Sequence, residues 1–306
     1  MRIVFMGTPS FAVPILEALI KEYEVVLVVT QPDKEVGRKK ILTPSPVKEV
    51  ALNNNIEVFQ PTKIKEDYQK ILDSNPDIII TAAYGQIIPK TILDYPKYKC
   101  VNVHASLLPK YRGGAPIHWA IINGDEYAGV TIMYMAEKMD AGDIISQDKL
   151  LIGEDDTTTL TNRLSLLGRD LLLKTLPDIF SGNINPIKQN ETEVSFAYNI
   201  SKEDEKINLN NTCKMVYNQI RGLSTTPGGY LIYNDKKVKV YSSTFIEKEI
   251  DGEIGEIVES NKKLGIKVKN GVIYPLTIQL EGKNKMSIKD FYNGMPNYFK
   301  VGEIVK

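Results

Sequence analysis

Residues 2–31, RIVFMGTPSFAVPILEALIKEYEVVLVVTQ, contain two short apolar runs separated by a helical pattern. The runs RIVFMG (2–7) and EVVLVVTQ (24–31) are rich in β-branched residues and largely continuous, which is typical of strands buried on both faces. The stretch between them, SFAVPILEALIKEY, predicts a helix. A strand, a helix and a second strand in this order predict one unit of a doubly wound parallel sheet.

The same alternation continues downstream of this unit. Further strands are predicted at IEVFQP (56–61), DIIITAAY (77–84) and KCVNVHAS (99–106), with short helical patterns between them. GVTIMYMAEKMDAGDIISQDKLLI then predicts a strand, a turn at MDAGD and a returning strand. A long amphipathic helix follows, beginning at Asp156 or Thr157 and ending at Gly182. We therefore predict an α/β, Rossmann-like parallel-sheet domain over residues 1–185.

The character of the sequence changes after this domain. Residues 186–206 are polar and predict a linker, and TCKMVYNQIRGLS predicts a short helix. From Tyr230 onward, short alternating strands are separated by turn signals. Residues 207–306 are therefore predicted to form a second domain, a small antiparallel barrel or sandwich.

Composition limits the class of protein. The chain has 306 residues, 42% hydrophobic and 25% charged, with zero formal net charge, as in ordinary globular proteins. It contains no run of roughly 20 apolar residues, and a strand predicted from Arg2 leaves no space for a leader, so we expect a cytoplasmic protein that makes no membrane contact. Cys100 and Cys213 are expected to be buried free thiols in a reducing compartment.

Arginine is scarce in this chain, and three arginines stand in glycine-rich loops. Arg38, Arg112 and Arg221 are the three, and because a guanidinium binds anions through a planar fork, we expect them to recognise anions. Since the net charge is zero, any nucleic-acid binding must use a local cationic patch. The patch GRKK, in the long insertion DKEVGRKKILTPSPVK (33–48), is one candidate. Lys267 and Lys269, on one face of a predicted strand, are another.

The sequence lacks the motifs of several enzyme classes. The loop after the first strand, MGTPSFAVP, lacks the second and third glycines of the dinucleotide fingerprint. The sequence has no G-x-S-x-G nucleophile motif, and its two histidines show no metal-ligand spacing, so no metal is expected.

The sequence VNVHAS carries the strongest catalytic signal. Strand alternation places Asn102 and His104 on the same side of a strand, at the carboxyl edge of the sheet where ligands bind in open α/β folds. An asparagine amide can stabilise a developing oxyanion, and a histidine can exchange protons near neutral pH. A carboxylate that orients the histidine could be Asp140, Asp143 or Asp125, and the pattern alone does not choose among them. His118 is expected to pack rather than to act in catalysis.

At these residues the chain resembles a known family. NVHASLLPKYRGGAPIHWAIINGD together with the downstream MDAGD resembles the folate-dependent formyltransferases. The stretches GTPSFAVP, TQPDKEVGRKKILTPSPVKEVA, QPTKI, AAYGQIIP and IRGLSTTPGG extend the resemblance, within that family, to the members that act on methionine attached to initiator tRNA. The similar stretches span almost the whole chain.

The resemblance implies an activity and a set of site residues. It implies transfer of the formyl group of 10-formyltetrahydrofolate to the α-amine of methionine on initiator tRNA, with Asn102, His104 and Asp140 as catalytic residues. It implies that the folate contacts Ser106, Leu107, Leu108 and Pro109, and that the tRNA acceptor arm contacts Arg38, Lys39 and Lys40.

The resemblance also implies that the C-terminal domain is an OB-type barrel that binds tRNA, and we expect a monomer. The insertion at residues 33–48 departs from the family pattern because the glycine that commonly follows Arg38 is missing. Two alternatives stay open: a formyltransferase acting on a small amine such as a sugar nucleotide or glycinamide ribonucleotide, and a non-catalytic RNA-binding protein on the same scaffold.

Overall fold

The computed structural model describes residues 1–37 and 39–306 and divides into two compact units. Unit 1 consists of residues 1–116, 127–151 and 161–198. Unit 2 consists of residues 117–126, 152–160 and 199–306, so it takes two short segments from within the span of unit 1. In the described part of the chain, no helix has the length and apolar character needed to cross a membrane.

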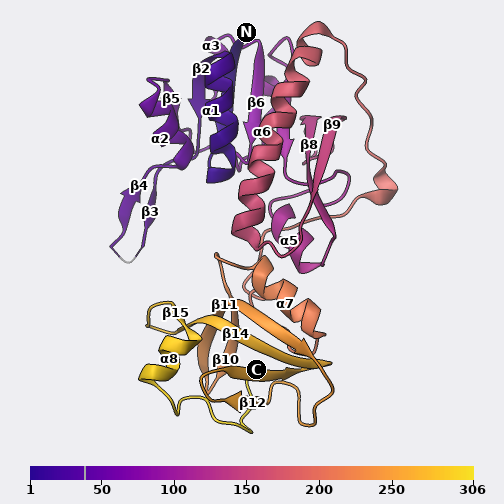
Figure 1. Ribbon diagram of the computed structural model, residues 1–306. Helices are drawn as coiled ribbons and strands as arrows, with labels where there is room; N and C mark the ends of the chain where they lie inside the picture. The colour runs from indigo at the N-terminus through magenta and orange to yellow at the C-terminus, as the bar shows by residue number, and fades with distance from the viewer. Residues whose placement is uncertain (38) are drawn as a thin grey trace. The chain divides into compact units, whose positions relative to one another are not determined.

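Unit 1 is built on a seven-stranded sheet with the strand order β5-β2-β1-β6-β7-β8-β9 (Figure 1). The strands are β1 (Arg2–Gly7), β2 (Glu24–Val29), β5 (Val58–Phe59), β6 (Ile78–Ala82), β7 (Cys100–His104), β8 (Tyr127–Tyr134) and β9 (Ile144–Leu151). Neighbours from β5 to β7 are parallel, whereas β8 and β9 run antiparallel to their neighbours. The predicted parallel sheet is thus a mixed one, because β8 and β9 are joined by a short turn rather than by a crossover helix.

Helices cover both faces of this sheet. They are η1 (Ser10–Ala12), α1 (Val13–Glu22), α2 (Pro46–Asn53), α3 (Gln69–Asp73), α4 (Lys90–Leu93) and α6 (Thr157–Ser181), and a short η2 (Glu191–Glu193) follows. α1 and α6 lie in front of the strands in Figure 1, and Gly168 of α6 approaches the side chains of Val103 and Val130. On the other face, Val4 and Met6 pack in one apolar cluster with residues of α3 and α4. Alternate residues of β1 are therefore buried on opposite sides.

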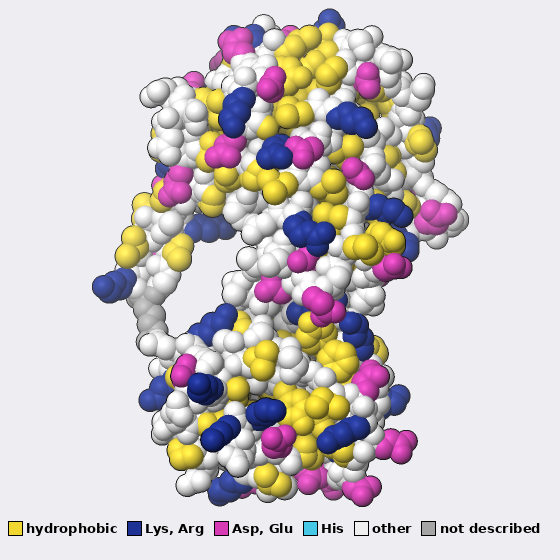
Figure 2. Space-filling view, in the orientation of Figure 1, with side chains coloured by type: hydrophobic (Ala, Val, Ile, Leu, Met, Phe, Trp, Pro, Cys, Tyr) yellow, Lys and Arg dark blue, Asp and Glu magenta, His cyan; other side chains and the backbone are white. Residues whose placement is uncertain are grey.

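The insertion at residues 33–48 forms a two-stranded hairpin of β3 (Lys34–Val36) and β4 (Ile41–Thr43). Its base is held by an ion pair between Lys48 Nζ and Asp33 Oδ2 at 2.7 Å, and by a hydroxyl pair between Thr30 and Ser45 at 2.7 Å. Hydrophobic and cationic side chains are exposed on the hairpin (Figure 2). Arg38, predicted here to contact tRNA, lies outside the described residues.

Unit 2 contains an antiparallel sheet with the order β10-β11-β14-β13-β12 and β15 paired to β14. The strands are β10 (Gly229–Tyr233), β11 (Lys236–Glu247), β12 (Ile257–Ser260), β13 (Leu264–Val268), β14 (Gly271–Leu280) and β15 (Met286–Ser287). The helices are α5 (Pro116–Ile122), α7 (Cys213–Gly222) and α8 (Ile288–Gly294). Apolar side chains of α7 and α8, including Val216, Ile220 and Phe291, form one core with the strands.

The C-terminal residues hydrogen-bond to strands at both ends of this sheet. The backbones of Lys306 and Ile232 of β10 exchange two hydrogen bonds, at 2.6 and 2.9 Å. The N–H of Val305 donates to the carbonyl of Gly255, just before β12, at 2.9 Å. Ile257, the first residue of β12, likewise donates to the carbonyl of Glu303 and accepts from the N–H of Gly302, both at 2.9 Å, so the end of the chain pairs with edge groups of β10 and β12 and protects them from pairing with other molecules.

Two predictions about individual side chains have definite outcomes. Cys100 and Cys213 are free and buried, as predicted, and burial raises the pKa of both thiols. The prediction that Lys267 shares an exposed face with Lys269 is wrong, because Lys267 is buried and its Nζ donates to the carbonyl of Ile250 at 2.5 Å. An ammonium group engaged in this way is not available to a phosphate.

Candidate active site

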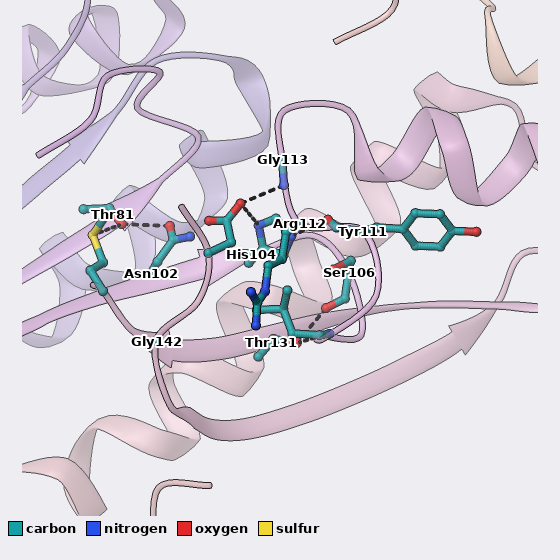
Figure 3. A network of polar contacts seen from close by, with 12 residues as sticks. Thr81, Asn102, His104, Ser106, Tyr111, Arg112, Gly113, Thr131 and Gly142 are labelled. Carbon is teal, nitrogen blue, oxygen red and sulfur yellow. Dashed lines mark hydrogen bonds and ion pairs between the residues drawn. The ribbon is translucent and has the colours of Figure 1, made fainter. Parts of the chain in front are cut away.

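The floor of the site is formed by neighbouring residues of β6 and β7. Asn102 is half-buried and lies opposite Thr81 in the parallel register. The hydroxyl of Thr81 donates to Asn102 Oδ1 at 2.7 Å, so the Nδ2 group of the amide remains as the donor for a ligand (Figure 3). Sequence reasoning missed Thr81, although a polar residue inside the apolar run DIIITAAY could have indicated it.

His104 follows Asn102 by two residues on the same strand, and its side chain is only 6% exposed. Its Nε2 lies 3.0 Å from the carbonyl oxygen of Tyr111. A carbonyl only accepts hydrogen bonds, so Nε2 carries a hydrogen and Nδ1 is the ring nitrogen left for proton exchange. Nδ1 faces Asp140 Oδ2 at 3.8 Å, within ion-pair range but beyond hydrogen-bond distance.

Asp140 comes from the turn between β8 and β9. Its Oδ2 also accepts a hydrogen bond from the backbone N–H of Gly113 at 2.8 Å (Figure 3). Of the three carboxylates that the pattern left open, the structure thus brings Asp140 to the histidine. The three predicted catalytic side chains converge at one edge of the sheet.

The turn that carries Asp140 has an uncommon backbone. Asp140 has φ +50°, a left-handed value that few non-glycine residues adopt. At Gly142 any larger residue is excluded, because a Cβ there would lie 1.8 Å from the carbonyl oxygen of Tyr134. A further polar side chain, that of Gln189, donates to the carbonyl oxygens of Asp140 and Gly142 at 2.7 and 2.8 Å. Gln189 lies in the predicted linker and had no local sequence signal.

The segment Ser106–Pro109, predicted to contact folate, is fixed by bonds within unit 1. Thr131 Oγ1 donates to the carbonyl of Ser106 at 2.6 Å and accepts from the N–H of Leu108 at 3.1 Å (Figure 3). Gln147 Nε2 donates to the carbonyl of Leu108 at 2.8 Å, and the Leu108–Pro109 peptide bond is cis. Because these backbone groups already have partners, the segment offers a rigid wall beside His104.

Two of the three loop arginines have structural partners, so the prediction that they bind anions is wrong for both. Arg112 is fully buried and forms a two-point ion pair with Glu191, which lowers the pKa of that carboxyl group. Arg221 lies in α7 rather than in the predicted loop, is buried in unit 2 and donates to the carbonyl oxygens of Gly153 and Asp155 at 2.9 and 2.7 Å. Both guanidinium groups donate hydrogen bonds to acceptors within the protein itself.

His118 lies in α5 of unit 2, and burial lowers its pKa. Among residues 1–37 and 39–306, no group of three or more His, Cys, Asp and Glu side chains is arranged to hold a metal ion. The chemistry that the converging residues offer is an amide donor, an imidazole and a carboxylate around one point, which suits stabilisation of an oxyanion coupled to a proton transfer.

Comparison with known proteins identifies the family to which the chain belongs. Residues 1–176 match the formyl transferase family model, and residues 199–296 match the model of the formyl transferase C-terminal domain. The chain is 49% identical to the methionyl-tRNA formyltransferase of Listeria innocua over 297 residues, covering 96% of this chain and 95% of the relative. It is 46% identical to that of Staphylococcus aureus over 301 residues, covering 97% of each.

A solved structure supports the fold assignment independently. The N-formyltransferase of Helicobacter canadensis, solved with folinic acid and dTDP-3-aminofucose, superposes with a TM-score of 0.70 at 23% identity. The match covers 89% of this chain and 98% of that protein. With both of its parts matched and close relatives aligned over nearly their whole length, the chain belongs to the formyl transferase family.

Proposed function

We propose that this protein transfers the formyl group of 10-formyltetrahydrofolate to the α-amino group of methionine on initiator tRNA. The observation that carries the proposal is the convergence of Asn102, His104 and Asp140 at the carboxyl edge of the sheet. The identity of 46–49% to methionyl-tRNA formyltransferases supports this acceptor over a sugar nucleotide or glycinamide ribonucleotide.

Each of the three side chains has its own role in the reaction. The amine attacks the formyl carbon, and the carbonyl electrons move to oxygen to give a tetrahedral intermediate. Nδ2 of Asn102 and protonated Nδ1 of His104 stabilise that oxygen, and one such donor contributes on the order of 10²–10³ in rate. As the intermediate collapses, the bond to folate N10 breaks, N10 takes up one proton and the amine loses one, so the step consumes no net proton. His104, with Asp140 beside it, gives its Nδ1 proton to N10 and regains one from the amine.

The substrates are assigned to separate parts of the chain. The wall at Ser106, Leu107, Leu108 and Pro109 contacts the folate. Arg38, Lys39 and Lys40 of the hairpin contact phosphates of the acceptor arm. We assign residues 1–185 to catalysis, 186–206 to a linker and 207–306 to an OB-type barrel that binds tRNA. The hydrogen bonds of the C-terminal residues with both ends of the sheet support barrel closure, and lysines on the visible face of that unit supply positive charge (Figure 2). We further propose a cytoplasmic monomer.

A formylation assay tests the proposal. The purified chain and 10-formyltetrahydrofolate are incubated with methionyl initiator tRNA, methionyl elongator tRNA, free methionine or an amino-sugar nucleotide, and the products are identified by mass spectrometry. We expect transfer to methionyl initiator tRNA, and its loss in His104→Ala with folate binding retained. Transfer to the sugar nucleotide would support the small-amine alternative, and tRNA binding without any transfer would support the non-catalytic one.

A further inference from the structure

The side chain of Gln189 connects the end of unit 1 to the turn that carries Asp140. Its Nε2 donates to two carbonyl oxygens of that turn, those of Asp140 at 2.7 Å and Gly142 at 2.8 Å. One amide group thus satisfies two acceptors on either side of a single residue. Gln189 contacts neither His104 nor Asn102 by hydrogen bond.

Arg112 determines which way the amide of Gln189 points. Its Nε donates to Gln189 Oε1 at 2.9 Å. A guanidinium has only donors, so the oxygen of the amide must face Arg112 and its NH₂ group must face the turn. Arg112 in turn is 0% exposed and is held by the two carboxylate oxygens of Glu191, at 2.8 and 3.4 Å.

The turn needs such support because its own geometry is strained. Asp140 adopts φ +50°, and backbone conformations of this kind persist where surrounding contacts enforce them. The described contacts of its carboxylate are the N–H of Gly113 and the more distant His104. The position of the carboxylate relative to the imidazole therefore depends on where the main chain of the turn is held.

We propose that Gln189, oriented by Arg112, is a positioning residue that holds Asp140 at its distance from His104. This inference rests on the proposed function for the role of Asp140 in the reaction. Gln189 is not a catalytic residue, because it acts only through the backbone of the turn.

The kinetic test replaces Gln189 with leucine, which has a similar size and no hydrogen-bonding groups. We expect kcat for methionyl-tRNA formylation to fall by about 10- to 100-fold, since a shift of about 1 Å in a catalytic group has effects of this order. KM for both substrates should stay within about threefold, because binding groups are untouched. The matched control is the same change at an exposed position, Gln69→Leu, whose side chain donates to Asp73 of the same helix and which should retain most activity.

A double-mutant cycle tests whether the effect passes through Asp140. In an Asp140→Asn background, Gln189→Leu should cause little further loss of kcat, because coupled residues are non-additive. If the two losses multiply, or if KM rises while kcat is unchanged, the inference is overturned. Should Gln189→Leu fail to fold, Gln189→Glu keeps the acceptor for Arg112 while removing the donors to the turn, and the same outcomes apply.

A spectroscopic readout separates this inference from the proposed function. The chain has two histidines, so ¹⁵N-histidine labelling gives ring signals for His104 and His118 alone, assigned with a His118→Gln variant. Gln189→Leu should shift the ring signals of His104 and leave those of His118 in place. Unmoved His104 signals would overturn the positioning role, whereas absence of formyl transfer by the unmutated protein would count against the proposed function only.

Discussion

Thr81→Val tests how the catalytic amide is oriented. The substitution keeps the β-branched shape but removes the hydroxyl that donates to Asn102 Oδ1 at 2.7 Å, in a side chain only 2% exposed. A net hydrogen bond of this kind is worth about 1 kcal/mol, which corresponds to about a fivefold change in rate when it sets the orientation of the donor. Deleting the donor itself, as in Asn102→Ala, should cost more, on the order of 10²–10³.

The assay is single-turnover formylation of methionyl-tRNA with saturating formyl donor. Thr81→Ser is the matched control, because it retains the hydroxyl and should remain close to the unmutated rate. Thermal unfolding of each variant separates a local effect from a loss of folded protein. A single-turnover rate constant for Thr81→Val equal to that of the unmutated protein would refute the orienting role, and so would an equal loss in Thr81→Ser.

Two further predictions concern the C-terminus and the hairpin. Removing residues 304–306 deletes the backbone hydrogen bonds of Val305 and Lys306 and the buried Val305 side chain, so it should lower the free energy of unfolding by about 3 kcal/mol or more in urea denaturation; an unchanged midpoint would contradict this. Hydrogen bonds from Lys48 and then Gln60 lower the pKa of Asp33 below 3.8, so its contribution is complete above pH 3.8 and is lost as the pH falls through the native value. Lys48→Met should raise that pKa in an NMR titration and make the hairpin more susceptible to protease at neutral pH, whereas an unmoved titration would argue against the ion pair.

The sequence predicted the parts of the fold that depend on local pattern. Continuous apolar runs alternating with helical ones predicted the strands and helices of unit 1, and alternation within VNVHAS placed Asn102 and His104 together. The returning strand after MDAGD was predicted and is β9, whereas the antiparallel pairing of β8 with β7 was missed because apolar runs do not report strand direction. The turn at MDAGD carried the prediction for β9, since so short a connection cannot contain a parallel crossover.

Hydrogen-bond partners that are far apart in the sequence could not be predicted, for a physical reason. Gln189 is 49 positions from Asp140 in the chain, and nothing in its neighbourhood distinguishes it from other polar linker residues. The glycines beside Arg112 and Arg221 are compatible with anion-binding loops, but Arg221 lies in α7, and burial and carbonyl or carboxylate partners decide the role of both residues. Such partners are set by the tertiary fold, which local composition does not encode.

Unit 2 is assembled from three stretches of the chain, and this constrains how such proteins can recombine. Gly222 of α7 lies against Ile122, and the carbonyl oxygen of Gly222 accepts a hydrogen bond from Thr157 at 2.6 Å. A chimera with one crossover near residue 199 would pair a donor α7 with resident α5 and 152–160 segments that evolved beside another sequence. A functional unit 2 can therefore be exchanged between relatives only when all three stretches are taken from the same protein.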